Sequence, residues 1–194
     1  MARIVVTEFV SLDGVMEDPG GAEGFEHGGW SFQFSRGEEG DQFKIDETRE
    51  SDAMLLGRKT YEGFADAWPQ RDGEFADLFN GMPKYVVSTT LRNPEWTNST
   101  VLGGDDVVAA VSELRDGSAG TIVVHGSAQL VQTLLDNDLV DELRLMVFPV
   151  VIGSGKRLFG ATGAMKRMRL ASSQIVGDGV AIMVYEPAGA DDGA

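Results

Sequence analysis

The sequence contains no cysteine and has few positive charges and no long apolar run. Without cysteine there are no disulfides, thiolate metal ligands or cysteine nucleophiles. The 16 lysines and arginines are outnumbered by 31 aspartates and glutamates, so the net charge is −15 and most of the surface repels nucleic acid and anionic membranes. No apolar run approaches the roughly 20 residues that a membrane-spanning helix needs. We therefore expect a cytoplasmic protein that binds neither nucleic acid nor membranes.

Other chemistries are excluded because their motifs are missing. The two histidines, His27 and His125, are too few for a convincing metal site, so we expect none. The glycine segment 153–156 fails both the phosphate-loop pattern and the dinucleotide fingerprint. A hydrolase motif G-x-S-x-G is absent as well.

The length and composition predict one domain. A chain of 194 residues with 42% hydrophobic residues suits a globular domain with its own core. We predict a single domain over residues 1–187 and a disordered tail at 188–194.

Apolar runs alternate with helix-like patterns over the first 136 residues. The runs are almost continuously apolar, which favours an α/β fold with a largely parallel, two-sided sheet. The last strands follow one another without helices, so that edge should be antiparallel. Strands are predicted at 3–10, 52–57, 84–89, 121–125, 140–152, 168–176 and 179–186, and helices at 38–51, 60–68, 105–115 and 127–136.

Three corners at the ends of predicted strands have the chemistry of an anion site. They are Gly57–Thr60, Ser88–Arg92 and His125–Gln129. Ligands of open α/β sheets bind at such strand ends, where a helix start offers free N–H groups and glycine lets a phosphate approach. Taken alone, each corner is more often only a tight turn and a helix cap. Three of them in an acidic chain favour a ligand with several phosphates, such as a dinucleotide.

The order of these segments resembles a known family. SLDG at 11–14, GRKTYE at 57–62, VVHGS at 123–127 and LVDELRL with PVVIGSGKRLFG within 139–160 resemble the dihydrofolate reductase superfamily. The resemblance is closer to the C-terminal reductase domain of the bifunctional deaminase–reductase of riboflavin biosynthesis, and it runs from about residue 4 to residue 185. It implies a dihydrofolate reductase-like three-layer fold with a mixed sheet of about eight strands, helices on both faces, NADPH as hydride donor, and a homodimer.

The resemblance also implies which residues hold the cofactor. The second corner lacks the arginine that follows the serine in dihydrofolate reductases, which leaves the preference for NADPH over NADH open. The third corner has His125 where the family usually has glycine, so this side chain either binds the cofactor or only fills the strand end. The implied residues are Gly57, Arg58, Lys59 and Thr60 for the phosphates, Ser88, Thr89 and Arg92 for the 2′-phosphate, His125, Gly126, Ser127, Ala128 and Gln129 for the pyrophosphate corner, and Gly153 and Gly155 near the nicotinamide.

The substrate side is predicted to combine the SLDG corner with the long aromatic loop that follows. Asp13 either binds a polar substrate edge or steers a proton as a catalytic residue, or it only forms an Asp-Gly turn. Met16, Trp30 and Phe34 either wall the pocket or belong to the core. A carboxylate from the next helix (Glu38, Glu39 or Asp41) either enters the site or only interacts favourably with the positive end of the helix dipole.

These features lead to one function and two alternatives. We expect an NADPH-dependent oxidoreductase of a small heterocyclic or ribosylamino substrate, resembling 5-amino-6-(5-phosphoribosylamino)uracil reductase. The zinc deaminase motif of the bifunctional enzyme needs cysteines, so a role in riboflavin synthesis would be limited to the reduction, and the chain is otherwise a standalone relative with a different substrate. The alternatives are a nucleotide-binding module without turnover and a dihydrofolate reductase-type enzyme.

Overall fold

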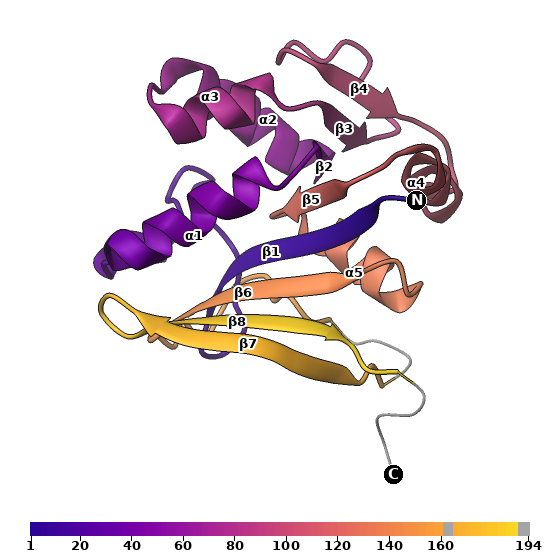
Figure 1. The fold of residues 1–194 in the computed structure, drawn as a ribbon. Helices are drawn as coiled ribbons and strands as arrows, with labels where there is room; N and C mark the ends of the chain where they lie inside the picture. The colour runs from indigo at the N-terminus through magenta and orange to yellow at the C-terminus, as the bar shows by residue number, and fades with distance from the viewer. Residues whose placement is uncertain (161–164, 190–194) are drawn as a thin grey trace.

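The computed structural model describes residues 1–160 and 165–189. Their eight strands form one sheet in the order β4-β3-β2-β5-β1-β6-β8-β7, with helices on both faces (Figure 1). All neighbours from β4 to β6 are parallel, whereas β8 runs antiparallel to β6 and β7. The strands are β1 (Arg3–Ser11), β2 (Ala53–Gly57), β3 (Lys84–Val87), β4 (Ser99–Leu102), β5 (Thr121–His125), β6 (Glu142–Phe148), β7 (Met168–Val176) and β8 (Val180–Pro187).

The helices form the outer two layers of this three-layer fold. In Figure 1, α1, α2 and α3 lie on one face of the sheet and α4 and α5 on the other. None of the helices within the described residues is long and apolar enough to cross a membrane. The α-helices are α1 (Gly37–Arg49), α2 (Arg58–Ala67), α3 (Glu74–Gly81), α4 (Val107–Gly117) and α5 (Ala128–Asp136), and the 3₁₀ helices are η1 (Trp30–Gln33) and η2 (Trp68–Gln70).

The predicted fold class is confirmed, but the sequence missed two elements. Helix α3 and strand β4 were not predicted, and the strand predicted at 140–152 ends at Phe148. Beyond it the chain leaves the sheet, because the N–H of Val150 donates to the carbonyl of Phe148 and the carbonyl of Val150 accepts from Leu12. Most of the tail predicted as disordered, residues 190–194, lies outside the described residues.

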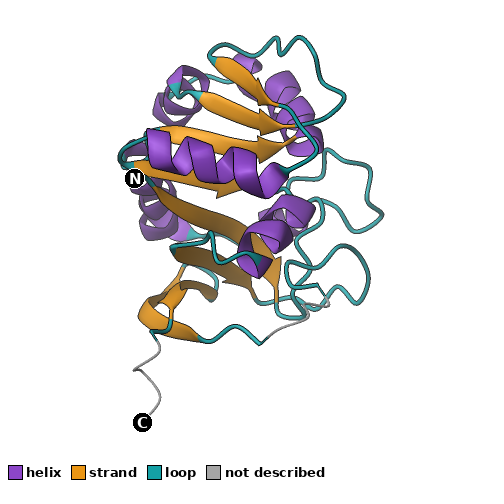
Figure 2. Ribbon diagram, turned by 90° about the vertical axis from the view of Figure 1, so that its right-hand side faces the viewer, coloured by secondary structure: helices purple, strands orange, loops and turns teal. Residues whose placement is uncertain are grey.

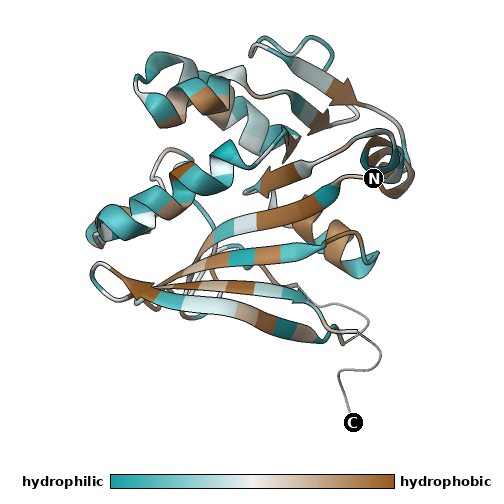
Figure 3. Ribbon diagram, viewed as in Figure 1, coloured by the Kyte–Doolittle hydropathy of each residue, from teal (hydrophilic) through white to brown (hydrophobic). Residues whose placement is uncertain are grey.

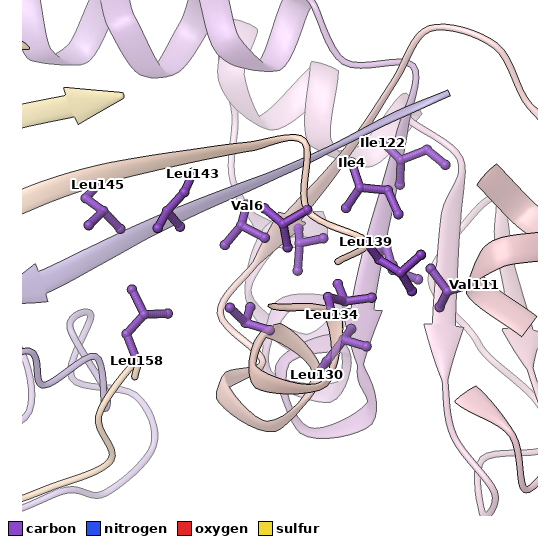
Figure 4. Close-up of a cluster of buried hydrophobic side chains, with 14 of the residues drawn as sticks. Ile4, Val6, Val111, Ile122, Leu130, Leu134, Leu139, Leu143, Leu145 and Leu158 are labelled. Atoms are coloured by element: carbon purple, nitrogen blue, oxygen red, sulfur yellow. The ribbon is translucent and has the colours of Figure 1, made fainter. Parts of the chain in front are cut away.

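The largest core cluster lies between the sheet and the helices α4 and α5. Figure 4 shows Leu130 and Leu134 of α5 among side chains of β1, β5 and β6, including Ile4 and Val6. Both strand residues are fully buried. Each such aliphatic side chain contributes about 1.5–3 kcal/mol when it is removed from water. This packing fixes α5 against the sheet and so positions its first residues.

The ends of the parallel strands form a step. Figure 2 shows loops gathered at the edge where the strand arrows end. Strand β5 stops at His125, which pairs with Thr7, whereas β1 continues to Ser11 beside Phe148 of β6. The central sheet therefore becomes narrower at the edge where ligands of α/β proteins bind.

Candidate active site

The first and third corners are bonded to each other. The N–H of Gly57 donates to Oγ of Ser127 at 2.9 Å, and the N–H of Ser127 donates to Oγ1 of Thr60 at 3.0 Å. The two hydroxyls are also 3.0 Å apart. Gly126 has φ +56°, and a Cβ there would lie 3.0 Å from Cγ2 of Thr60. The two corners, which are 67 residues apart between Thr60 and Ser127, thus form one compact backbone surface.

Two helices begin at this surface without a side-chain cap. Gly57 precedes α2 and Ser127 precedes α5, and within the described chain neither helix start has a capping hydrogen bond from the side chain at its N-cap. Helix α4 differs, because the carboxylate of Asp106 accepts the N–H of Ala109 at 2.9 Å. Uncapped first-turn N–H groups and the helix dipoles favour an anion. The joined corner therefore has the donor set that a pyrophosphate needs.

The two cations of the first corner have different surroundings. Arg58 donates to both carboxylate oxygens of Glu62, each at 2.9 Å, in an exposed pair one helical turn apart. Such a pair contributes only about 0.2–0.5 kcal/mol, so a phosphate can compete for the guanidinium. Lys59 is exposed. Hydrogen bonding to Lys156 lowers the pKa of Glu17, and the more distant positive charge of Lys59 lowers it further. Lys59 is therefore within electrostatic range of the loop that contains Glu17.

The second corner is adjacent, since β3 pairs with β2. Ser88 is buried, and its Oγ accepts the N–H groups of Thr90 at 3.1 Å and Leu91 at 2.9 Å. The serine hydroxyl therefore stabilises its own turn rather than facing outward. Thr89 and Arg92 are exposed and remain the candidates for a 2′-phosphate.

Asp13 connects the SLDG turn to the loop that contains Gly153. Its carboxylate accepts from the N–H groups of Ile152 at 3.0 Å and Gly153 at 2.9 Å and from the hydroxyl of Ser11 at 2.7 Å. Arg157 also contacts it, at 3.4 Å. These bonds, led by that from Ile152, hold the pKa of Asp13 well below its usual value. A carboxylate that remains ionised has no proton to give, so the geometry favours a positioning role over the predicted proton transfer.

Replacing Asp13 by asparagine is expected to loosen this loop. The amide group removes the negative charge and places a donor against N–H groups that need an acceptor. We expect the amides of Ile152 and Gly153 to exchange hydrogen at least about tenfold faster, measured by mass spectrometry. The control is Asp41→Asn, which removes an exposed carboxylate paired with Arg36. Unchanged exchange in the Asp13 variant would show that the loop is held by other contacts.

Two of the three predicted pocket walls are core residues. Trp30 is 1% exposed, its indole N–H donates to the carbonyl of Glu17, and its ring meets that of Phe148 edge-on at 5.5 Å. Met16 is 6% exposed and packs in the cluster beneath α5. Both side chains are thus used in packing, and the prediction that they wall a pocket is not supported by their positions. Phe34 is half-buried against Phe148 and stays a candidate.

Sequence reasoning missed a group of buried polar residues. Glu8, Lys44 and Glu47 are 5%, 7% and 2% exposed. Burial raises the pKa of Glu8 well above its usual value. The helix carboxylates that were considered, including Glu38 and Glu39, are exposed instead. The signal was available in the helical spacing, because the buried residues of α1 recur at the three- and four-residue intervals of one helix face.

A hollow of about 570 Å³ lies at the other edge of the sheet. It is lined by residues before β2 and β3, among them Ser51, Asp52 and Pro83. Because those residues precede the strands, this hollow is far from the joined corner. Its lining includes the first turn of α3, but that turn carries the acidic side chains of Glu74 and Asp77, which would repel an anion.

Comparison with known proteins identifies the family. The family described as the RibD C-terminal domain matches residues 2–182. The chain belongs to this family. Two proteins of Bacillus subtilis (strain 168), named as the uncharacterized proteins YyaP and YwjB, are both 28% identical to it, over 188 and 174 residues. The alignment with YyaP covers 94% of each chain, and that with YwjB covers 88% of this chain and 90% of YwjB.

Two crystal structures share the fold. One is a protein of Shewanella sp. PV-4 that is named as a putative riboflavin biosynthesis protein. The two structures superpose with a TM-score of 0.78, their sequences are 20% identical, and the alignment covers 96% of this chain and 99% of the Shewanella chain. The other is a pyrimidine reductase-like protein of Corynebacterium diphtheriae. Its TM-score is 0.67 and its sequence is 13% identical, and the alignment covers 96% of this chain and 92% of the Corynebacterium chain. Membership of the RibD C-terminal family supports a reductase-like role, while these distant structures establish the fold.

Proposed function

We propose that the protein is a cytoplasmic, NADPH-dependent reductase of a small heterocyclic or ribosylamino substrate. The observation that carries the proposal is the joined corner, where two uncapped helix starts meet through Thr60 and Ser127 in a chain of net charge −15. Such an arrangement suits the pyrophosphate of a dinucleotide. Membership of the RibD C-terminal family and the pyrimidine reductase-like name of a structural neighbour support reduction of a ring substrate.

The residues of the joined corner fit this cofactor. Gly57 and Gly126 let the two corners approach closely, because a Cβ at Gly57 would meet Ser127 and one at Gly126 would meet Thr60. Lys59 and Arg92 are exposed cations at neighbouring strand ends. When bound, NADPH supplies the hydride. The protein would bind and orient it, and the loop held by Asp13 would keep water from the reacting atoms.

Titration with NADPH and with NADH tests the proposal. Trp68 contacts Phe79, and Phe79 contacts His125 at the third corner, so tryptophan fluorescence should report binding. We expect a dissociation constant in the micromolar range for NADPH, about −8 kcal/mol, and weaker binding of NADH because Arg92 and Thr89 then lack a 2′-phosphate. If neither nucleotide binds at about 1 mM, the corners are only turns and the reductase proposal fails.

We also propose a homodimer formed through the antiparallel edge of the sheet. Leu170 and Ile175 of β7 are 46% and 68% exposed, and they pair with Tyr185 and Ala181 on one face of the hairpin. An exposed apolar edge of this kind is usually covered.

Replacing Ile175 by lysine is expected to convert the dimer into a monomer, because the ammonium group cannot be desolvated in an apolar interface. Sedimentation equilibrium measures the mass. The matched control is Ser172→Lys, which changes an exposed β7 residue paired with Val184 on the opposite face of the hairpin. A wild-type protein that sediments as a monomer at all concentrations, or an unchanged mass for the Ile175 variant, would contradict this interface.

A further inference from the structure

The turn between β7 and β8 lies at the same edge of the sheet as the candidate site. Ala181, the second residue of β8, pairs with Val147, which is one residue before the end of β6. The hairpin turn, Gly177–Gly179, therefore adjoins the carboxyl ends of the parallel strands. Figure 3 shows it below the hydrophilic first turns of α1, with hydrophobic colour on the adjoining ends of β7 and β8. The last strands of the chain thus reach the side of the sheet that α1 covers.

The hairpin turn is bonded to the segment that leads into α1. The N–H of Ser35 donates to Oδ2 of Asp178, and the N–H of Asp178 donates to the carbonyl of Ser35, both at 2.8 Å. A Cβ at Gly177 would collide with the carbonyl oxygen of Ser35, so glycine is needed for the two backbones to approach this closely. The turn and the segment therefore form one unit, although 143 positions separate Ser35 from Asp178.

The bonded segment carries two side chains to the aromatic surface at this end of the sheet. The ring of Phe34 lies 6.3 Å from that of Phe148, and the guanidinium group of Arg36 lies 5.3 Å from the ring centre of Phe9. Phe148 is the last residue of β6, and Phe9 is two residues before the end of β1. The position of residues 34–36 therefore shapes the surface beside the candidate site.

The last two residues of β7 face opposite sides of the sheet. Val176 is 2% exposed, and a Cβ at Gly40 of α1 would lie 3.1 Å from its Cγ2. Ile175 is 68% exposed and is the residue that we place in the dimer interface. Successive side chains of a strand point to opposite faces. A partner subunit packed on Ile175 would therefore fix the strand end whose other face supports the first turn of α1.

We propose that the hairpin turn transmits dimer formation to the site, with Asp178 as the positioning residue. When the partner subunit holds Ile175, the end of β7 is fixed, Asp178 holds Ser35, and residues 34–36 keep one position. The carboxylate is the part of this link that a substitution can remove, because the second bond joins backbone groups. This inference goes beyond the proposed reductase function and rests on the proposed homodimer.

The test measures hydrogen exchange at the amides of Phe34 and Gly40 in the full chain by nuclear magnetic resonance. Both N–H groups donate to backbone carbonyls within residues 31–36, so neither bonds to Asp178. In Ile175→Lys, which we expect to be monomeric, both should exchange at least about fivefold faster, at the lower end of usual couplings between sites. Dilution of the wild type until it sediments as a monomer should give the same rise without any substitution.

Asp178→Ala shows whether the turn carries the effect. In the dimer this change should speed exchange at the same two amides about fivefold, and adding Ile175→Lys should then increase it by less than about twofold, because the link is already broken. Asp178→Asn keeps an acceptor oxygen for the N–H of Ser35 and should stay within about twofold of the wild type. The control is Ser172→Lys on the opposite face of β7, which should change neither the mass nor the exchange.

The outcomes distinguish transmission from simple packing. Unchanged exchange in a monomeric Ile175 variant, or in the diluted wild type, overturns the inference. An Ile175→Lys effect that is undiminished after Asp178→Ala also overturns it, because the effect would then bypass the turn. A wild type that is monomeric at all concentrations overturns the dimer and this inference together. An effect that disappears in Asp178→Ala and persists in Asp178→Asn supports it, and the NADPH titration tests the reductase proposal independently of all these results.

Discussion

Replacing Ser127 by aspartate is expected to abolish NADPH binding while the protein stays folded. Ser127 has φ +63°, a conformation that aspartate and asparagine tolerate better than most residues. The helix dipole also stabilises a negative charge at the start of α5. The same carboxylate would stand in the seam between Gly57 and Thr60, beside the place that we assign to the pyrophosphate. Two like charges about 4 Å apart near a protein surface repel by about 4 kcal/mol. Affinity for NADPH should therefore fall at least about 100-fold, measured by the fluorescence titration.

Ser127→Asn is the matched control for this experiment. Asparagine has the same shape as aspartate and no charge, and it also loses the serine hydroxyl that lies between Gly57 and Thr60. We expect it to weaken NADPH binding by no more than about tenfold. Melting temperatures of the two variants should be similar. If aspartate and asparagine reduce the affinity equally, charge at this position is irrelevant and the pyrophosphate binds elsewhere.

The corners were predictable because their signals are local. Gly57 and Gly126 interrupt apolar runs, and the chain direction places both interruptions at carboxyl ends of parallel strands. The sequence did not show that the two corners bond to each other, because strand order decides which ends are neighbours. Nor did it show that Arg58 pairs with Glu62, although their spacing of four residues allows it.

The elements that were missed carry weaker signals. Strand β4 has four residues, lies at the sheet edge and is only partly buried, so it lacks the alternation that marks a strand. Helix α3 has Phe75, Ala76 and Phe79 on one face, but it spans only eight residues between Gly73 and Pro83. Short elements of this kind are stabilised by tertiary contacts more than by their own propensity.

The substrate side was less predictable because residue type does not fix side-chain direction. Trp30 had been considered for a pocket wall, yet it is enclosed by Phe148, a residue more than a hundred positions away. The partners of Asp13 are equally remote, since Ile152 is 139 residues from it. Lys44 and Glu47 were overlooked because charged residues are usually exposed. Only the rotation of α1 about its axis, which turns these two positions toward the sheet, shows that they point inward.

Replacing Lys84 by methionine is expected to cause a large loss of stability. Lys84 is 0% exposed, and its ammonium group donates to the carbonyls of Asn80 and Met82, both at 2.8 Å, and of Thr97 at 3.1 Å. It also lies 4.2 Å from the ring centre of Trp96. Methionine fills the space but leaves three carbonyls without their donor, which should lower the free energy of unfolding by about 3 kcal/mol. For a domain of this size the melting temperature should fall by about 6–12 °C.

This lysine should also give the wild type a distinctive pH dependence. Burial lowers the pKa of Lys84 to about 8 in the folded state, whereas an unfolded lysine titrates near 10.4. Between these values the unfolded chain binds more protons, so this group makes the wild type more stable as pH rises through that window. The variant lacks this contribution, and the stability gap between the two proteins should widen from pH 8 toward pH 10. The control is Lys59→Met, which removes an exposed lysine and should change neither the melting temperature nor its pH dependence. A Lys84 variant that melts within about 2 °C of the wild type would contradict this prediction. Water would then bond the three carbonyls in place of the ammonium group, and α3 and β4 would not need Lys84 for their stability.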